Sequence, residues 1–150
     1  LNDNFTLYLT AGYLNTEATG IEEICGLEDP TGCEGRRLFW APEVTAAGRL
    51  NANFPMSDGA VTGSFEMYYE SERGGGWEDN PEGYIDAYAI ANLRVGYESN
   101  DNWYVRAYAE NLFDEFTWDG YNANGGIIPS HFFGPMRPLT LGVMVGMSWD

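Results

Sequence analysis

Lysine is absent from this sequence, and basic residues of any kind are scarce. The 150 residues include 7 Lys+Arg, all of them arginine, against 23 Asp+Glu, which gives a formal net charge of -16. So acidic a surface repels the phosphates of DNA and RNA. The composition therefore argues against a nucleic acid as partner.

Long apolar runs are also missing. No run of eighteen or more apolar residues occurs, so the sequence predicts no transmembrane helix. No signal peptide is present, and the chain starts at Leu1. We therefore expect a mature segment or a piece of a longer polypeptide.

Every second residue is apolar in the last strand of the sequence, while Thr140, Gly142, Met144, Gly146 and Ser148 fill the alternate places. The apolar set is Leu139, Leu141, Val143, Val145, Met147 and Trp149. A period of two held over about eleven residues is the length that a tilted strand needs to cross a bilayer. An apolar face that ends in an aromatic residue is typical of the closing strand of an outer-membrane β-barrel. The alternative is an amphipathic strand packed on a soluble core.

The same alternation recurs in five upstream segments. They span residues 5–13, 44–54, 61–70, 87–98 and 103–110. In each segment the charged residues fall on one face only, as lipid contact requires, because an arginine facing lipid near the midplane costs about 2–4 kcal/mol. The apolar face often ends in an aromatic residue, such as Tyr13, Phe54 or Trp103, where a barrel carries its interfacial girdle. These segments predict an all-β, antiparallel transmembrane barrel.

The connections alternate in length. Residues 17–41, 71–85 and 112–137 form long connections, whereas 55–59 and 99–102 are short. Bacterial barrels have long extracellular loops and short periplasmic turns. We therefore expect the long connections outside the cell and the C-terminus in the periplasm. Six strands cannot close a membrane barrel, since the smallest bacterial ones use eight, so the chain must pair with further barrel.

Three short motifs near the C-terminus resemble those of TonB-dependent outer-membrane receptors. They are NLRVGY at 92–97, NLFD at 111–114, and Arg-Pro at 137–138 leading into LTLGV at 139–143. The resemblance covers residues from about 86 to the end, and residues 1–85 match only as generic barrel strands and loops. It implies that residues 1–150 are the C-terminal six strands, 17 to 22, of a 22-stranded barrel. It also implies a plug domain and a TonB box, neither of which lies in this chain.

One departure from the family concerns the C-terminus. Family members usually end on an aromatic residue, whereas here Trp149 is penultimate and Asp150 follows. The difference bears on how the chain is presented to the barrel-assembly machinery rather than on the fold.

Two cysteines, Cys25 and Cys33, lie in the first long connection. The cell exterior is oxidising, so we predict a disulfide, which stabilises so small a loop by roughly 2–3 kcal/mol in the chain-entropy model. A metal site is the alternative, but two thiols without a nearby histidine make a weak case. We predict no metal site, no cofactor and no catalytic residues.

Aromatic residues gather in the last long connection, together with the only histidine. They are the candidate ligand contacts Trp118, Tyr121, His131, Phe132 and Phe133. Carbohydrates, porphyrins and catecholate siderophores all stack on aromatic faces. The alternatives are loops that pack on themselves and, for His131, a histidine hydrogen-bonded to backbone.

The sequence therefore predicts an outer-membrane active transporter of a Gram-negative bacterium rather than an enzyme. The family resemblance implies import of a scarce nutrient, such as a ferric siderophore or an oligosaccharide, driven by the TonB energy-coupling complex. The expected partners are the rest of the barrel, the plug, membrane lipid, the barrel-assembly machinery and an extracellular small-molecule ligand. A passive porin is the alternative, and a soluble secreted β-sandwich that binds carbohydrate is the third interpretation.

Overall fold

The computed structural model describes residues 3–21, 25, 30–76, 79, 83–122 and 132–149. Its main element is a six-stranded antiparallel sheet in which each strand lies beside the next long strand of the chain. The strands are β1 (Phe5–Tyr13), β2 (Val44–Met56), β3 (Gly59–Glu70), β6 (Tyr88–Ser99), β7 (Trp103–Glu110) and β10 (Thr140–Met147). All six predicted strands are present.

The register brings side chains of one kind into rows across the sheet. One row runs through Leu7, Leu50, Phe65, Leu93, Ala109 and Leu141. Because successive side chains of a strand point to opposite faces, the rows of apolar residues share one face and the charged residues share the other. The phase that the sequence predicted for each strand is therefore confirmed.

The apolar face is not covered by a second layer within the described part of the chain. Leu9 is 73% exposed and Val145 is 72% exposed, although both lie in the middle of strands. The few deeply buried apolar residues, such as Cys33, Ile85 and Tyr88, lie at one end of the sheet or beyond it. A soluble domain would bury its strand centres and leave its margins exposed. This sheet does the reverse.

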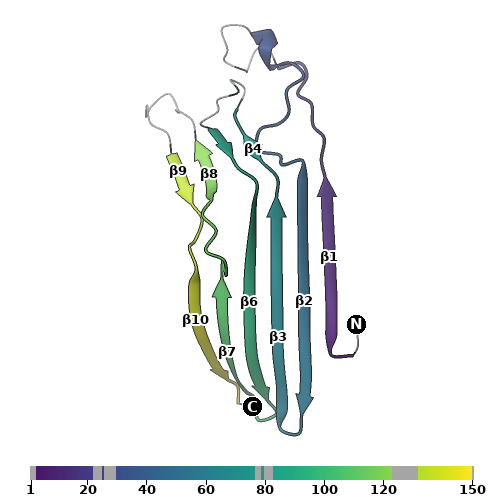
Figure 1. The fold of residues 1–150 in the computed structure, drawn as a ribbon, viewed down its shortest axis with the longest axis vertical. Coiled ribbons are helices and arrows are strands. Elements are labelled where there is room, and N and C mark those ends of the chain that lie inside the picture. The colour runs from purple at the N-terminus through teal and green to yellow at the C-terminus, as the bar shows by residue number, and fades with distance from the viewer. Residues whose placement is uncertain are drawn as a thin grey trace.

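All the long connections leave the sheet at one end, and the short turns lie at the other (Figure 1). The turn between β2 and β3 is the pair Ser57–Asp58, shorter than the predicted 55–59 because both strands extend further. The last strand ends at Met147, so Trp149 follows it. The predicted order of long and short connections is confirmed.

Two small hairpins stand on the long connections, and the sequence did not predict them. One pairs β4 (Arg73–Gly74) with β5 (Tyr84–Ile85), and the other pairs β8 (Trp118–Asn122) with β9 (Phe132–Pro135). A short 3-10 helix, η1 (Pro30–Cys33), lies in the first connection. None of these segments alternates long enough to be recognised by periodicity.

Glycines of the last strand are explained by the tyrosines of β7. A Cβ added to Gly142 would collide with the ring of Tyr108, and one added to Gly146 would collide with the ring of Tyr104. The two rings lie over the glycine backbone on the charged face of the sheet. Among the described residues, no helix is long and apolar enough to cross a membrane.

Candidate functional site

Ion pairs stabilise the charged face of the sheet. Glu66 lies between two arginines, with Arg49 Nη2 at 2.7 Å from one carboxylate oxygen and Arg94 Nη1 at 3.1 Å from the other. The three residues come from β2, β3 and β6, and Arg49 directly faces Glu66 in the register. The inward-facing charges that the sequence placed on this face therefore pair with one another.

A second ion pair, between β6 and β7, lies nearer the short turns on the same face. Arg106 Nη2 is 2.5 Å from Glu98 Oε1, and the Arg106 guanidinium carbon is 4.5 Å from the centre of the Tyr104 ring. Exposed pairs of this kind contribute at most about 1 kcal/mol each to stability. Because the charges pair, this face carries many charged groups but is nearly neutral locally.

Shallow hollows lie on this charged face, and arginine side chains line two of them. One, of about 340 Å³, is lined by residues that include Ser64, Arg94 and Arg106. The other, of about 360 Å³, is lined by residues that include Tyr8, Arg49 and Glu66. Both are open depressions between strands, so they offer polar contacts without an enclosed binding chamber.

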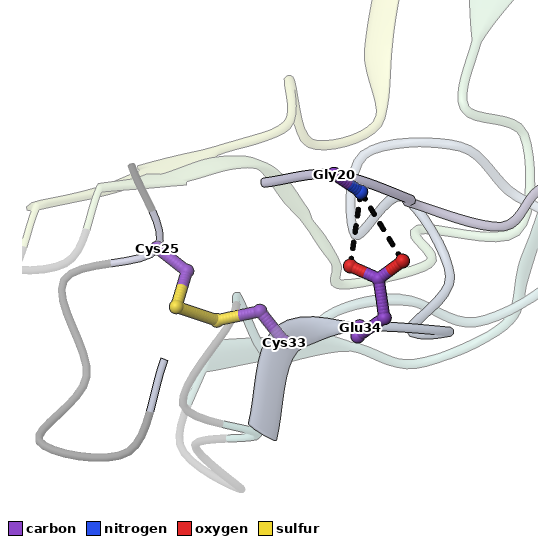
Figure 2. The surroundings of a disulfide bond; sticks show 4 residues. All are labelled: Gly20, Cys25, Cys33 and Glu34. Carbon is purple, nitrogen blue, oxygen red and sulfur yellow. Dashed lines mark hydrogen bonds between the residues drawn. A yellow bond between two sulfur atoms is a disulfide. The ribbon is translucent and has the colours of Figure 1, made fainter. Parts of the chain in front are cut away.

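The first long connection is closed by the predicted disulfide. Cys25 and Cys33 are both buried, their Cα atoms are 6.1 Å apart, and their sulfur atoms are bonded. Next to the disulfide, the backbone N–H of Gly20 donates to both carboxylate oxygens of Glu34, at 3.1 and 3.0 Å (Figure 2). The prediction of a disulfide rather than a metal site is confirmed.

Tyr84 of β5 contacts Asp79 within the second long connection. Its hydroxyl donates to Asp79 Oδ1 at 2.6 Å. This hydrogen bond, with partial burial, raises the pKa of the Tyr84 phenol above its ordinary value. The phenol therefore remains a donor throughout the physiological range and keeps Asp79 beside the β4–β5 hairpin.

The NLFD segment has a structural role, because its side chains connect neighbouring strands by hydrogen bonds. Asn111 is 3% exposed, and its side chain makes three hydrogen bonds, to Glu115 N, Glu115 O and Arg137 O. Its backbone N–H donates to Asn92 Oδ1 at 3.0 Å. Asp114 Oδ1 accepts from Leu139 N at 2.8 Å. The motif that carried the family resemblance thus joins the end of β7 to β6 and to the start of β10.

The candidate ligand contacts lie on the β8–β9 hairpin. The backbone register sets Tyr121 opposite Phe133, and Asn122 opposite Phe132. Trp118 packs edge-on against Phe116, with ring centroids 5.1 Å apart. His131 lies outside the described residues, as do the side chains of Tyr121, Phe132 and Phe133. The hairpin therefore brings the backbone positions of four candidates together.

Many acidic residues lie in the long connections, where they form an acidic rim, and they are exposed where the structure describes them. Those described are Glu17, Glu34, Asp79, Asp114, Glu115 and Asp119. Among the described residues, no three His, Cys, Asp or Glu side chains are grouped closely enough to hold a metal ion. Sequence reasoning missed Arg73, which contacts Trp40 of a different connection. No local pattern identifies such a pair.

Two solved structures resemble this arrangement. The ferric yersiniabactin uptake receptor FyuA from Yersinia pestis matches with a TM-score of 0.73 and 15% identity, over 95% of this chain and 20% of the receptor. BauA, the ferric preacinetobactin receptor from Acinetobacter baumannii, matches with a TM-score of 0.70 and 17% identity, over 96% of this chain and 19% of the receptor. The chain has the fold of part of these receptor barrels.

The match confirms the all-β antiparallel class and agrees, at the level of fold, with the resemblance to TonB-dependent receptors. The chain spans about a fifth of the length of each receptor. No protein-family model and no curated protein matches the sequence.

Proposed function

We propose that this chain is the C-terminal part of the barrel of an energised outer-membrane importer. The observation that carries the proposal is the sheet itself, whose apolar face leaves strand residues such as Leu9, Val95 and Val145 exposed, while the ion pairs among the described residues of the sheet lie on the opposite face. In a barrel, the apolar face contacts lipid and the charged face lines the lumen.

The edges of the sheet support pairing with further barrel. One edge of β1 and one edge of β10 have no partner strand among the described residues. Unpaired backbone groups in lipid cost several kcal/mol each. The rest of the barrel therefore pairs at both edges, and a plug domain occupies the lumen beside the charged face.

The orientation follows from the connections. The three long connections face the cell exterior, and the short turns and the C-terminus face the periplasm, as bacterial barrels require. The Cys25–Cys33 disulfide then lies in an oxidising compartment. The barrel-assembly machinery inserts the protein, and the TonB complex supplies the force for import.

The substrate class that we propose is a ferric siderophore. Two receptors that share the fold are receptors for ferric compounds, and the sequence of the β8–β9 hairpin contains aromatic residues of a kind that suits a chelate with aromatic rings. The acidic rim disfavours polyanions, although salt screens this repulsion beyond about 8 Å. An oligosaccharide is the other substrate class that aromatic stacking allows.

Uptake of iron tests the proposal. Iron-starved cells that express the complete outer-membrane protein should take up a ⁵⁵Fe-loaded triscatecholate siderophore with saturation, and a protonophore should abolish uptake. A strain with the gene deleted is the control. Non-saturable passage that survives the protonophore would instead identify a porin. Recovery of the protein in the soluble fraction without detergent would identify a secreted domain.

A further inference from the structure

Arg73 is the residue at which all three long connections meet. It begins β4, in the second connection. Its guanidinium carbon lies 5.2 Å from the centre of the Trp40 ring, in the first connection. Its Nη2 donates to the carbonyl oxygen of Asp119 in β8, in the third connection, at 3.3 Å. Its Nε forms an ion pair with Glu70, the last residue of β3.

The Arg73–Glu70 ion pair is shielded from solvent, and a residue of β3 stabilises it. The Arg73 and Glu70 side chains are 12% and 9% exposed. The hydroxyl of Tyr68 donates to the second oxygen of Glu70 at 2.6 Å. The guanidinium is therefore anchored to the sheet, because Glu70 is itself fixed by a neighbour of its own strand.

Two further contacts join the long connections around Arg73. The backbone N–H of Gly74 donates to the carbonyl oxygen of Phe39 at 2.5 Å, which joins the first and second connections a second time. Ile85 of β5 is 1% exposed, and β5 packs beside β8. The β8–β9 hairpin thus packs beside β5, and Arg73 provides the polar contact between the hairpin and the other connections.

The chemistry of arginine suits this position. A planar guanidinium can pair with a carboxylate, stack on an aromatic ring and donate to a carbonyl at the same time. An ammonium group is a compact, hydrated charge that cannot meet all three demands in one geometry. Asp119, which accepts the bond, follows Trp118 directly in β8.

We propose that Arg73 is a positioning residue for the aromatic contacts of the β8–β9 hairpin. It holds the hairpin against the other two long connections, so that the residues that contact a ligand are in place before the ligand binds. The inference rests on the proposed function for its ligand, but the positioning itself is a property of the fold.

Hydrogen exchange on the complete protein in lipid nanodiscs tests the positioning. In Arg73→Lys, the amides of 118–122 and 132–135 should exchange about tenfold faster, while those of β2 and β3 remain as in the parent. The matched control is Arg37→Lys, which alters a more exposed arginine of the first connection that pairs with Glu43 at 2.7 Å. Exchange in the hairpin equal to that of the control would overturn the inference.

A second variant covers the case in which Arg73→Lys fails to assemble. Trp40→Leu removes the stacking partner and leaves the Arg73–Glu70 pair in place, so it should accelerate exchange in the same two segments by a smaller factor. No acceleration in that variant would overturn the inference as well.

Uptake kinetics separate this inference from the proposed function. For the ⁵⁵Fe-loaded triscatecholate, Arg73→Lys should raise KM about tenfold and leave Vmax unchanged, because the translocation machinery is intact. Accelerated exchange with an unchanged KM would contradict the role in ligand contact. If the parent itself shows no saturable uptake, the proposed function fails, and the exchange result still decides the positioning.

Discussion

The side-chain amide of Asn111 donates a hydrogen bond to the carbonyl oxygen of Arg137, at 3.1 Å across 26 residues of sequence. This bond closes the base of the last long connection, because Asn111 follows β7 and Arg137 precedes β10. The backbone of Asn111 has a φ of 51°, a left-handed conformation that asparagine tolerates better than most residues. Asn111 thus both forms the turn after β7 and closes the base of the last long connection.

Replacing Asn111 by alanine should destabilise the barrel by about 2–4 kcal/mol, because three partly buried hydrogen bonds, each worth roughly 1 kcal/mol, are lost. Urea unfolding of the complete protein in lipid vesicles measures the change. Asn100→Ala is the matched control, since that side chain makes one hydrogen bond in an exposed turn. Equal effects of the two substitutions would show that the NLFD segment has no special structural role.

An added positive charge should destabilise the protein more on the apolar face of β2 than on its charged face. Leu50 lies on the apolar face and Asn51 on the charged face. Leu50→Arg should cost about 2–4 kcal/mol, since it places a cation in the lipid region, whereas Asn51→Arg should cost less than about 1 kcal/mol in a wet lumen. The same unfolding measurement, with heat-dependent gel mobility as a check of assembly, distinguishes them. A larger cost for Asn51→Arg would reverse the assignment of the faces.

The six long strands could be predicted from sequence because their signal is local. Lipid on one face and water on the other impose a period of two on every strand, as in the series from Leu139 to Met147. The cysteine pair was predictable for a similar reason, since two cysteines in one short loop leave few alternatives. The boundaries differ by only a few residues at each end.

The hairpins on the long connections could not be predicted, because non-local contacts determine them. Arg73 meets Asp119 across 46 residues of sequence, and Phe39 meets Gly74 across a comparable gap. The segments themselves are too short to show alternation. The candidate aromatic residues were found by composition, but only the β8–β9 register brings their backbone positions together.

The topology can be tested on intact cells. An epitope inserted near Gly75 should be labelled by an antibody added outside, because it would stand on a long connection. An epitope at Asp58 should be labelled only after the outer membrane is permeabilised, because Asp58 lies in the turn between β2 and β3. Labelling of Asp58 on intact cells, with Gly75 protected, would invert the proposed orientation.

Aromatic contacts with the ligand should appear in affinity. Replacing both Trp118 and Phe132 by alanine should weaken the affinity for the ferric chelate in uptake about thirtyfold if each ring contributes on the order of 1 kcal/mol. Phe113→Ala is the control, since Phe113 is 64% exposed in the NLFD segment rather than on the hairpin. Unchanged affinity in the double variant, with normal assembly, would leave the aromatic residues as loop packing.

The most direct test of the account is a spin-label scan of residues 140–147 in the complete protein, reconstituted in lipid vesicles. Collision with oxygen reports lipid exposure, and collision with a water-soluble nickel chelate reports water exposure. A lipid-facing sheet predicts a period of two, with labels at 141, 143 and 145 accessible to oxygen and labels at 140 and 144 accessible to nickel; Gly142 and Gly146 are left unlabelled, because an added side chain would collide with a tyrosine ring. Accessibility to nickel at every position, without alternation, would contradict a lipid-facing sheet.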